Sequence, residues 1–266
     1  MARKPAWAIA KERERRDGGG RVWLFGIHAV RDALANPRRL RHRLVVTRNA
    51  AERLTAEIAT AGMEPEIADP RRFPVPLDPQ SVHQGAALEV DPLAWGSVSE
   101  VCAPRGAAPR VLLLDRVTDP HNVGAVLRSA EVFGARAVIA PHRHSAPETG
   151  ALAKAASGAL ERQPYLRVPN LAASLGALRE MGYAAVGLDG AAPQALEEAV
   201  APFADRPLAL ALGAEGPGLR DLTLKLCDAI GRIEAAGAFG SLNVSNAAAI
   251  ALYAAARSGY DRDGDG

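Results

Sequence analysis

The feature that most constrains the fold is an alternation of short apolar segments with amphipathic segments over residues 110–260. The first apolar segment contains only Val and Leu, which is typical of a strand buried on both faces. We predict strands over 111–114, 137–140, 165–168, 183–188, 208–212 and 229–233, and helices over 123–133, 152–156, 171–181, 219–227 and 243–257. Strands that alternate with helices predict an α/β fold with a parallel sheet covered on both faces.

A shorter alternation precedes this one and predicts a separate small α/β domain. Its first helical pattern stops at Pro37, and further patterns predict a helix over 51–61 and strands over 44–46 and 86–90. A stretch with three prolines then separates the two alternations. We therefore divide the chain into a flexible basic arm (1–20), a small domain (21–92), a linker (93–109), a larger domain (110–260) and a flexible acidic tail (261–266).

Composition restricts the class of protein and its compartment. The chain has 266 residues, of which 48% are hydrophobic, so it can bury a sizeable core. No apolar run approaches the roughly 18 residues of a membrane span, and the N-terminus lacks the apolar centre of a signal peptide. Cys102 and Cys227 are isolated, which argues against a disulfide framework and against a zinc site. We expect a cytoplasmic protein that contacts no membrane and needs no metal.

The net charge of +2 conceals an uneven distribution of basic residues. Five arginines and no acid lie between residues 38 and 48, namely Arg38, Arg39, Arg41, Arg43 and Arg48. The guanidinium fork matches phosphate oxygens, so this cluster predicts an RNA-binding surface. A solvated basic face without any partner explains the same cluster about as well.

Three polar stretches, 119–128, 213–219 and 241–247, fall beside the ends of predicted strands. In parallel sheets, ligands bind beyond the carboxyl ends of the strands. In the first stretch, Asn122 can simply cap the helix that follows it. Arg128 interrupts an apolar series, so we expect it to be at least half-buried and paired with an anion. The candidate anions are Asp115, Glu131 or a substrate phosphate.

The other two stretches also have simple structural explanations. The glycines at 213, 216 and 218 allow close backbone approach to a ligand, but they match neither a phosphate-binding P-loop nor a dinucleotide fingerprint. Glu215 is unusual among them, because a carboxylate repels phosphate. The stretch 241–247 places Ser and Asn before an Ala-rich run, as a helix cap does.

Other chemistries find little support in the sequence. Ser241, His121 and Asp119 are the residue types of a hydrolase triad, but no GxSxG elbow accompanies them. His142 and His144 form an HxH pair without a third ligand at metal-binding spacing. A dehydrogenase is disfavoured because the chain lacks the glycine fingerprint and its acidic ribose partner.

Taken together in order, the three polar stretches resemble the signature motifs of the SpoU (TrmH-like) family of RNA ribose 2′-O-methyltransferases. The matching segments read NVGAVLR (122–128), GAEGPGL (213–219) and SLNVS (241–245). Upstream, FGIHAV (25–30) and VHQG (82–85) resemble the L30-like RNA-binding domain of bacterial members that methylate a guanosine ribose in 23S rRNA. The resemblance implies a C-terminal SPOUT domain with a deep trefoil knot, and a homodimer with the active site near the subunit interface.

The resemblance also implies a cofactor and a set of site residues. The cofactor is S-adenosylmethionine, held largely by backbone groups of Gly213, Ile233 and Leu242. The implied catalytic residues are Asn122, Arg128, Glu215, Ser241 and Asn243. We expect Arg128 to clamp a substrate phosphate, because Arg is effectively always protonated. Ser241 and Asn243 then orient the ribose, and Glu215 fixes Arg128 or Asn122.

The chain departs from the family pattern at two positions. Glu234 stands where Pro is usual, and Asn246 stands where an apolar residue is common. Glu234 adds a charge close to the cofactor loop and puts the geometry of that loop in question. The motifs do not encode the RNA, so tRNA is an alternative substrate to rRNA. A non-catalytic RNA-binding protein is a further alternative, against which the intact catalytic residues count.

Overall fold

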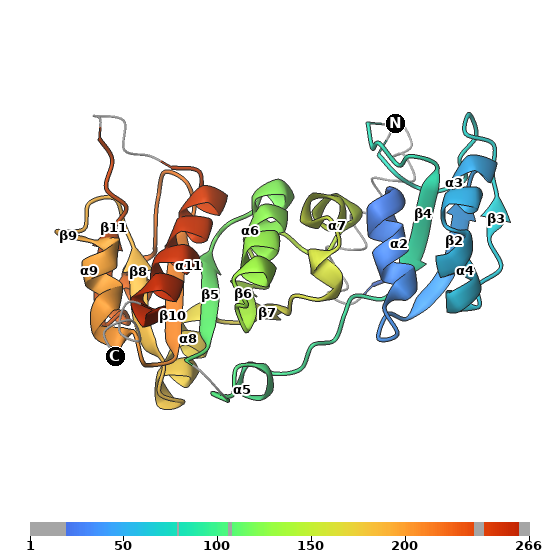
Figure 1. The fold of residues 1–266 in the computed structure, drawn as a ribbon. Coiled ribbons are helices and arrows are strands. Elements are labelled where there is room, and N and C mark those ends of the chain that lie inside the picture. Colours follow the sequence, from blue (N-terminus) through green and yellow to red (C-terminus); the bar gives the residue numbers. More distant parts are fainter. Residues whose placement is uncertain (1–19, 79, 106–107, 237–241, 261–266) are drawn as a thin grey trace. The chain divides into compact units, whose positions relative to one another are not determined.

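The computed structural model describes residues 20–78, 80–105, 108–236 and 242–260, which form two compact units (Figure 1). The first unit contains the described chain up to Ala94 together with Glu148–Glu161, and the second contains Trp95–Pro147 and the described chain from Arg162 onward. The predicted arm and acidic tail lie almost entirely outside the described residues, apart from Gly20.

The two units differ from the predicted domains in two places. We assigned Glu148–Glu161 to the larger domain, but this segment packs in the first unit, where α7 (Gly150–Ala156) contacts β1 (Val22–Phe25). The predicted linker (93–109) is divided between the units. Residues 93 and 94 belong to the first unit, and the chain from Trp95 onward belongs to the second. There Trp95 and the short helix α5 (Val98–Val101) pack against the core and α8 (Leu171–Glu180).

The first unit is a small α/β domain, as its sequence predicts. Its other elements are α2 (Ile27–Ala35), β2 (Arg41–Val46), α3 (Arg48–Arg53), α4 (Thr55–Ala61), β3 (Glu66–Ile67), β4 (Ala86–Val90) and the 3₁₀ turn η1 (Ala159–Glu161). The strand order is β1-β4-β2-β3, with β4 antiparallel to both neighbours and β3 parallel to β2. The predicted helix 51–61 is two helices, which meet at the fully buried Leu54.

Close packing fixes α7 on the first unit. Thr149 caps this helix by accepting a hydrogen bond from the Leu152 backbone N–H. A Cβ atom at Gly150 would lie 2.4 Å from the Phe25 ring and 2.4 Å from the backbone oxygen of Trp23. Only glycine therefore allows α7 to approach β1 this closely.

The second unit is built on a parallel sheet of seven strands, six of which the apolar segments predict. The strands are β5 (Arg110–Asp115), β6 (Ala137–Pro141), β7 (Tyr165–Val168), β8 (Ala184–Leu188), β9 (Gln194–Ala195), β10 (Leu208–Gly213) and β11 (Ala229–Arg232). Their order is β7-β6-β5-β10-β8-β11-β9, and all neighbouring strands in this order pair in parallel. The sequence did not predict the two-residue strand β9, which is too short to carry a period-two pattern.

Helices cover both faces of this sheet. On one face, α8 packs on a core that includes Val111 and Leu113 of β5. The remaining α-helices are α6 (Pro120–Val132), α9 (Leu196–Val200), α10 (Asp221–Lys225) and α11 (Val244–Tyr260). A 3₁₀ turn, η2 (Ala201–Phe203), follows α9 directly. The helix α11 contacts α6, α9, β10 and β5 (Figure 1). In the part of the chain that the structure describes, no helix is both long enough and apolar enough to cross a bilayer.

The topology brings two loops together at the carboxyl edge of the sheet. β5 lies between β6 and β10, so the chain leaves β5 on one side and returns on the other. The last residues of β5 and β10, Asp115 and Gly213, are paired in register. Such a switch point is where open parallel sheets place their ligand sites.

Candidate active site

The loop after β5 presents Asn122 at the carboxyl edge of the sheet. Asp119 caps α6, because its side chain accepts a hydrogen bond from the His121 backbone N–H at 3.0 Å. The helix thus begins at Pro120, three residues before the predicted start. Asn122 is not the cap that its simple structural explanation suggests. Its side chain lies on the first turn and is free to make contacts outside the helix.

The loop after β10 folds back on itself and exposes Glu215. The Gly218 N–H donates to the Ala214 oxygen at 2.9 Å, and the two residues form an isolated antiparallel bridge. A Cβ atom at Gly213 would lie 2.0 Å from the backbone carbon of Gly218, so this reversal requires glycine. Gly216 at the tip has a φ of +84°, a conformation that L side chains rarely adopt.

The residue before α11 completes the cluster. Asn243 caps this helix, since its Oδ1 accepts hydrogen bonds from the Ser245 backbone N–H at 2.9 Å and the Ser245 hydroxyl at 2.5 Å. Its Nδ2 donates to Glu215 Oε1 at 2.8 Å and to Asn122 Oδ1 at 2.9 Å. Residues from three distant stretches, which the sequence predicts at one edge, therefore meet.

Glu215 is the centre of this cluster, which we call the Glu215 cluster (Asn122, Glu215 and Asn243). Glu215 Oε1 accepts from Asn243, from the Val244 backbone N–H at 3.3 Å and from Asn122 Nδ2 at 3.4 Å. No hydrogen bond to Glu215 Oε2 is formed within the described chain, and the residue is exposed. Of the two partners expected for Glu215, Asn122 contacts it in the described chain and Arg128 does not, and Asn243 is hydrogen-bonded to Glu215 as well.

Arg128 differs from its predicted environment. It is exposed, and it makes no hydrogen bond or ion pair with any residue that the structure describes. The buried residues Val123, Val126, Leu127 and Ala130 follow the helical period, which turns Arg128 to the opposite face of α6. The expectation of a half-buried Arg with a protein anion is therefore wrong.

The two anions proposed for Arg128 are engaged elsewhere. Asp115 is fully buried and accepts hydrogen bonds from Arg220 at 2.7 Å and from the Thr223 hydroxyl at 2.8 Å. Glu131 pairs with Arg162. Of the three candidates, only a substrate anion is left for Arg128.

The remaining predicted site residues lie near the same edge or outside the described chain. Ser241 falls among residues 237–241, which are outside the described residues. Leu242, which precedes Asn243, is 44% exposed, and Ile233 directly follows β11. The unusual Glu234 pairs with Arg232 at 3.2 Å, so its charge is partly compensated. Asn246, the other departure, is exposed on α11 and needs no apolar contact.

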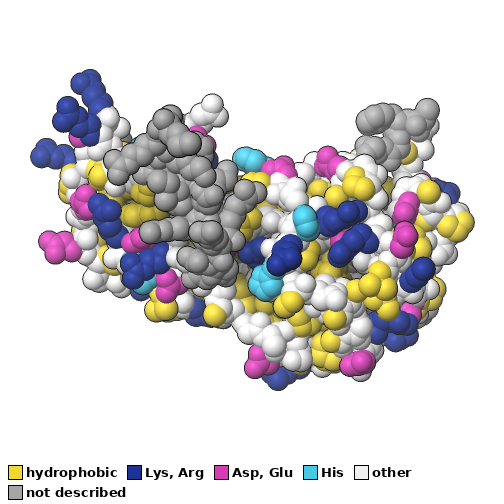
Figure 2. Space-filling view, turned by 180° about the vertical axis from the view of Figure 1, so that it is seen from behind, with side chains coloured by type: hydrophobic (Ala, Val, Ile, Leu, Met, Phe, Trp, Pro, Cys, Tyr) yellow, Lys and Arg dark blue, Asp and Glu magenta, His cyan; other side chains and the backbone are white. Residues whose placement is uncertain are grey.

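The predicted RNA-binding arginines divide into one buried residue and four others. Arg39 is buried and binds Glu161 through Nε at 3.0 Å, and it also pairs with Glu148. Since its charge is neutralised inside the first unit, the prediction that it binds RNA is wrong. Arg38, Arg43 and Arg48 are exposed, and Arg41 is half-buried against the Leu34 backbone oxygen. On the face shown in Figure 2, Lys and Arg side chains gather in several groups.

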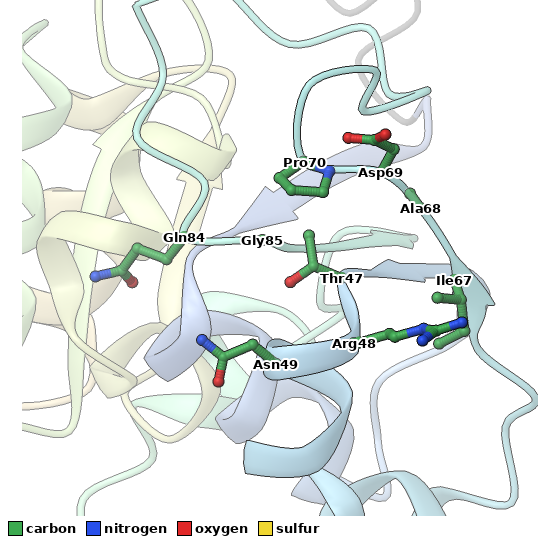
Figure 3. A pocket seen from close by; sticks show the side chains of 9 residues that line it. All are labelled: Thr47, Arg48, Asn49, Ile67, Ala68, Asp69, Pro70, Gln84 and Gly85. Atoms are coloured by element: carbon green, nitrogen blue, oxygen red, sulfur yellow. The ribbon is translucent and has the colours of Figure 1, made fainter.

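Arg48 borders a pocket of about 720 Å³ in the first unit, at the junction of β2 with α3 (Figure 3). The pocket is lined by Thr47, Arg48, Asn49, Ile67, Ala68, Asp69, Pro70, Gln84 and Gly85. In Figure 3, the Arg48 side chain extends beside Ile67, and Asp69 and Pro70 form the opposite rim. Apart from Arg48 and the VHQG stretch, these residues carry no signal in the sequence, because the pocket forms from three separate segments of the chain.

Comparison with known proteins identifies the family. The chain belongs to the SpoU rRNA Methylase family, whose model matches residues 109–253, and residues 23–95 match the model for RNA 2′-O ribose methyltransferase substrate binding. The 23S rRNA (guanosine-2′-O-)-methyltransferase RlmB of Pseudomonas putida is 37% identical over 239 residues, which cover 88% of this chain and 95% of that protein. The resemblance seen in the sequence is therefore confirmed.

Two further comparisons extend this result. An uncharacterised tRNA/rRNA methyltransferase of Synechocystis is 37% identical over 90% of this chain, but the chain spans only 63% of that protein's length. The SpoU methyltransferase AviRb from Streptomyces viridochromogenes, solved with AdoMet, has a TM-score of 0.76 at 24% identity and covers 99% of each chain. This structural likeness confirms the fold of both units.

Proposed function

We propose that this chain transfers a methyl group from S-adenosylmethionine to the ribose 2′-hydroxyl of a guanosine in 23S rRNA. The observation that carries the proposal is the Glu215 cluster, in which the three family motifs meet at the carboxyl edge of the sheet. The RlmB relatives, 37% identical over most of both chains, support rRNA as the substrate. A tRNA ribose is the alternative, since the motifs themselves do not encode the RNA.

The edge of the sheet suits S-adenosylmethionine, which supplies the methyl group when bound. Gly213 and Ile233 end or follow β10 and β11, and Leu242 exposes an apolar side chain beside Asn243. Gly213 admits no Cβ, so backbone groups line the loop there. These three residues hold the cofactor through backbone hydrogen bonds and apolar contact. The pairing of Glu234 with Arg232 keeps that carboxylate occupied beside the loop.

The polar residues act on the ribose and its phosphate. A 2′-hydroxyl is a weak nucleophile, and methyl transfer requires close alignment of the reacting atoms. Arg128 clamps a phosphate of the substrate, because it is exposed and has no protein anion among the described residues. Glu215 fixes Asn122 and Asn243, and Asn243 has both amide hydrogens engaged. Asn243 therefore orients the ribose mainly through Asn122, together with Ser241.

The first unit binds the RNA around the target nucleotide. Arg48 is the best placed of the predicted arginines, because it is exposed at the rim of the pocket and makes no ion pair within the described residues. Arg38, Arg41 and Arg43 add positive charge before and along β2 in the same unit, although Arg43 also pairs with Glu66. Arg39 contributes to folding instead.

The chain acts as a homodimer in the cytoplasm. Val132 of α6 and Tyr253 of α11 are 78% and 52% exposed, and the Phe133 and Tyr253 rings meet edge to face. Exposed apolar side chains on two adjacent helices suit an interface with a second copy. Arg128 lies on the exposed side of α6, so this interface would border the active site. The trefoil knot that the family implies is part of the same proposal.

The test is transfer of labelled methyl from S-adenosylmethionine to unmodified 23S rRNA and to bulk tRNA, with the modified nucleotide mapped. We expect label in a single rRNA guanosine ribose and its loss in Arg128→Ala. Arg128→Lys should retain only a small part of the activity, because Lys cannot form the bidentate contact with phosphate.

Other outcomes would contradict the proposal at different points. Label in tRNA alone would overturn the substrate. Absence of label despite measurable cofactor binding would overturn free rRNA as the substrate. Absence of both label and cofactor binding would favour a non-catalytic RNA-binding protein.

A further inference from the structure

The loop that follows β6 carries three exposed side chains capable of donating hydrogen bonds, His142, Arg143 and His144. We call it the HRH loop (residues 142–144). No acidic residue occurs from 141 to 147. In the sequence, His142 and His144 form an HxH pair of the kind that can bind a metal ion. Among the described residues, however, no group of three or more His, Cys, Asp or Glu is placed to hold one.

The backbone of the HRH loop is fixed at both ends. The His142 N–H donates to the Val168 oxygen at 2.7 Å, and Arg167 donates to the His142 oxygen. The Ser145 hydroxyl donates to the Pro141 oxygen, which closes the turn. His144 adopts a left-handed φ of +60°, which is uncommon for a residue other than glycine. These contacts hold the loop in one conformation and leave its three side chains exposed.

The far end of the loop is attached to the loop that carries the active site. The Ala146 N–H donates to the Val117 oxygen at 3.2 Å, and the Tyr165 hydroxyl donates to the Ala146 oxygen at 2.7 Å. Val117 lies two residues before Asp119, the cap of α6. Because β6 and β10 flank β5 on either side, their loops lie about 10 Å apart, or two strand spacings.

Two arginines with unused hydrogen-bond donors belong to the segments that contact the HRH loop. The Nε atoms of Arg116 and Arg167 are buried and have no hydrogen-bond partner within the described chain. Arg116 directly precedes Val117, and Arg167 already contacts the loop backbone. Unpaired guanidinium donors raise the positive potential around the loop and favour an anion there.

We propose that the HRH loop binds the RNA backbone on one side of the nucleotide whose ribose is methylated. Arg143 binds a phosphate through its guanidinium fork, and the two imidazoles donate hydrogen bonds to neighbouring phosphate or sugar oxygens. The Glu215 cluster holds the target ribose on the other side of β5. The loop thereby sets the position of the strand along the sheet edge, and this inference rests on the proposed methyltransferase function.

Burial and the nearby Arg167 lower the pKa of His142. This imidazole is therefore neutral at pH 7 and contributes a hydrogen bond without a charge. Of the three side chains, Arg143 supplies the permanent charge. We therefore expect Arg143 to dominate the salt dependence, and His142 to affect affinity with little change in that dependence.

The test compares Arg143→Ala with Arg105→Ala in the full-length chain. Arg105 is an exposed arginine on the amino side of β5, so its removal is a matched loss of one charge far from the proposed surface. Binding of unmodified 23S rRNA is measured over a range of salt concentrations, and methyl transfer is measured at a range of RNA concentrations. Affinity for S-adenosylmethionine is measured separately.

We expect Arg143→Ala to raise the KM for RNA about tenfold, as loss of a charged hydrogen bond does. The slope of log affinity against log salt should fall by about 0.7, as for one contact to single-stranded RNA. The affinity for S-adenosylmethionine should stay unchanged. Arg143→Lys should restore the salt slope, because the charge returns, but only part of the affinity.

Equal RNA affinity and equal salt slopes in Arg143→Ala and Arg105→Ala would overturn the proposal. So would a drop in kcat with no change in the KM for RNA. Failure of the wild-type chain to methylate any RNA would instead contradict the proposed function, since the difference in salt slope between the two variants needs no turnover.

Discussion

Two polar clusters in this molecule contain glutamate, one of them buried and the other exposed. In the first unit, Arg39 has no exposed side-chain surface and lies between Glu148 and Glu161, which are 10% and 4% exposed. In the second unit, Glu215 and Asn243 are exposed and bind each other. Each charged group of the buried cluster has an oppositely charged partner inside the fold, whereas Glu215 in the exposed cluster has one carboxylate oxygen that accepts no hydrogen bond from the described residues.

This difference separates a structural role from a functional role. A buried charge must be paired, because an unpaired one costs several kcal/mol. The buried cluster of Arg39, Glu148 and Glu161 is therefore needed to attach residues 148–161 to the first unit. Its charged groups bind one another and are not available to a ligand. The Glu215 cluster is organised without burial, so its stability contribution is small and its unused groups remain available to a substrate.

The largest expected effect is on catalysis. Glu215→Ala removes the acceptor shared by Asn122, Asn243 and the Val244 N–H, so both amides lose their positions. We expect methyl transfer to fall by about 10²-fold or more, as misplacement of reacting groups does, with little change in the unfolding midpoint. Glu215→Gln is the control of equal size and should retain more activity than Ala. Unchanged turnover in Glu215→Ala would show that the cluster is only structural.

The largest expected effect on stability comes from the buried cluster. Arg39→Met leaves Glu148 and Glu161 without their cation, and we expect a loss of about 3–5 kcal/mol in the free energy of unfolding of the first unit. Arg43→Met is the control, because its exposed pair with Glu66 should contribute less than about 1 kcal/mol. Denaturant unfolding followed by Trp23 fluorescence, with Trp7 and Trp95 replaced by Phe in every variant, would measure both. Similar losses in the two variants would contradict the contrast.

A smaller effect is expected where α7 approaches β1. Gly150→Val places side-chain atoms within the space of the Phe25 ring and the Trp23 backbone oxygen. We expect a destabilisation of about 1–3 kcal/mol by overpacking. Gly176→Val on α8 is a suitable control, since a Cβ there meets nothing within 4 Å. Any loss in that variant reports helix propensity alone, and an equal loss in both would exclude the close packing as the cause.

The smallest effect concerns pH. Burial raises the pKa of Glu148 above its usual range, although Arg39 opposes the rise. Since the folded protein holds this proton more tightly than the unfolded chain, the stabilising contribution is complete below the ordinary pKa of Glu and is lost as pH rises through the raised pKa. Glu148→Gln should therefore flatten the fall in stability of the first unit above about pH 4.3. An unchanged pH profile would show that Glu148 ionises freely in the fold.

Sequence patterns predict much of the second unit, because its strands and helices are determined by the residues within each short segment. Apolar strands such as 111–114 are recognisable from their composition, and the parallel arrangement then places the ends of β5 and β10 together. The meeting of Asn122, Glu215 and Asn243 follows from that arrangement and from the family motifs. Helix ends are harder to predict, as α6 shows, because Asp119 competes with Asn122 as the cap.

The features that the sequence does not predict depend on contacts between distant segments. Nothing in the composition of Glu148–Glu161 indicates which unit it joins, because the decision rests on Gly150 and on the partners of Arg39. In the sequence, Arg39 is one of five arginines in a basic cluster. Its burial depends on Glu148 and Glu161, which lie more than 100 residues further along the chain. Arg128 reads as an interruption of an apolar series, although the helical period turns it outward.

The most direct test of the central claim is a double-mutant cycle in methyl transfer to 23S rRNA with Asn122→Ala, Glu215→Ala and the double variant. If the two residues act as one unit, the double variant should be about as active as Glu215→Ala alone, because the second substitution removes a group that is already misplaced. If the two losses multiply instead, Asn122 and Glu215 act independently, and the Glu215 cluster is not the organising centre of the site.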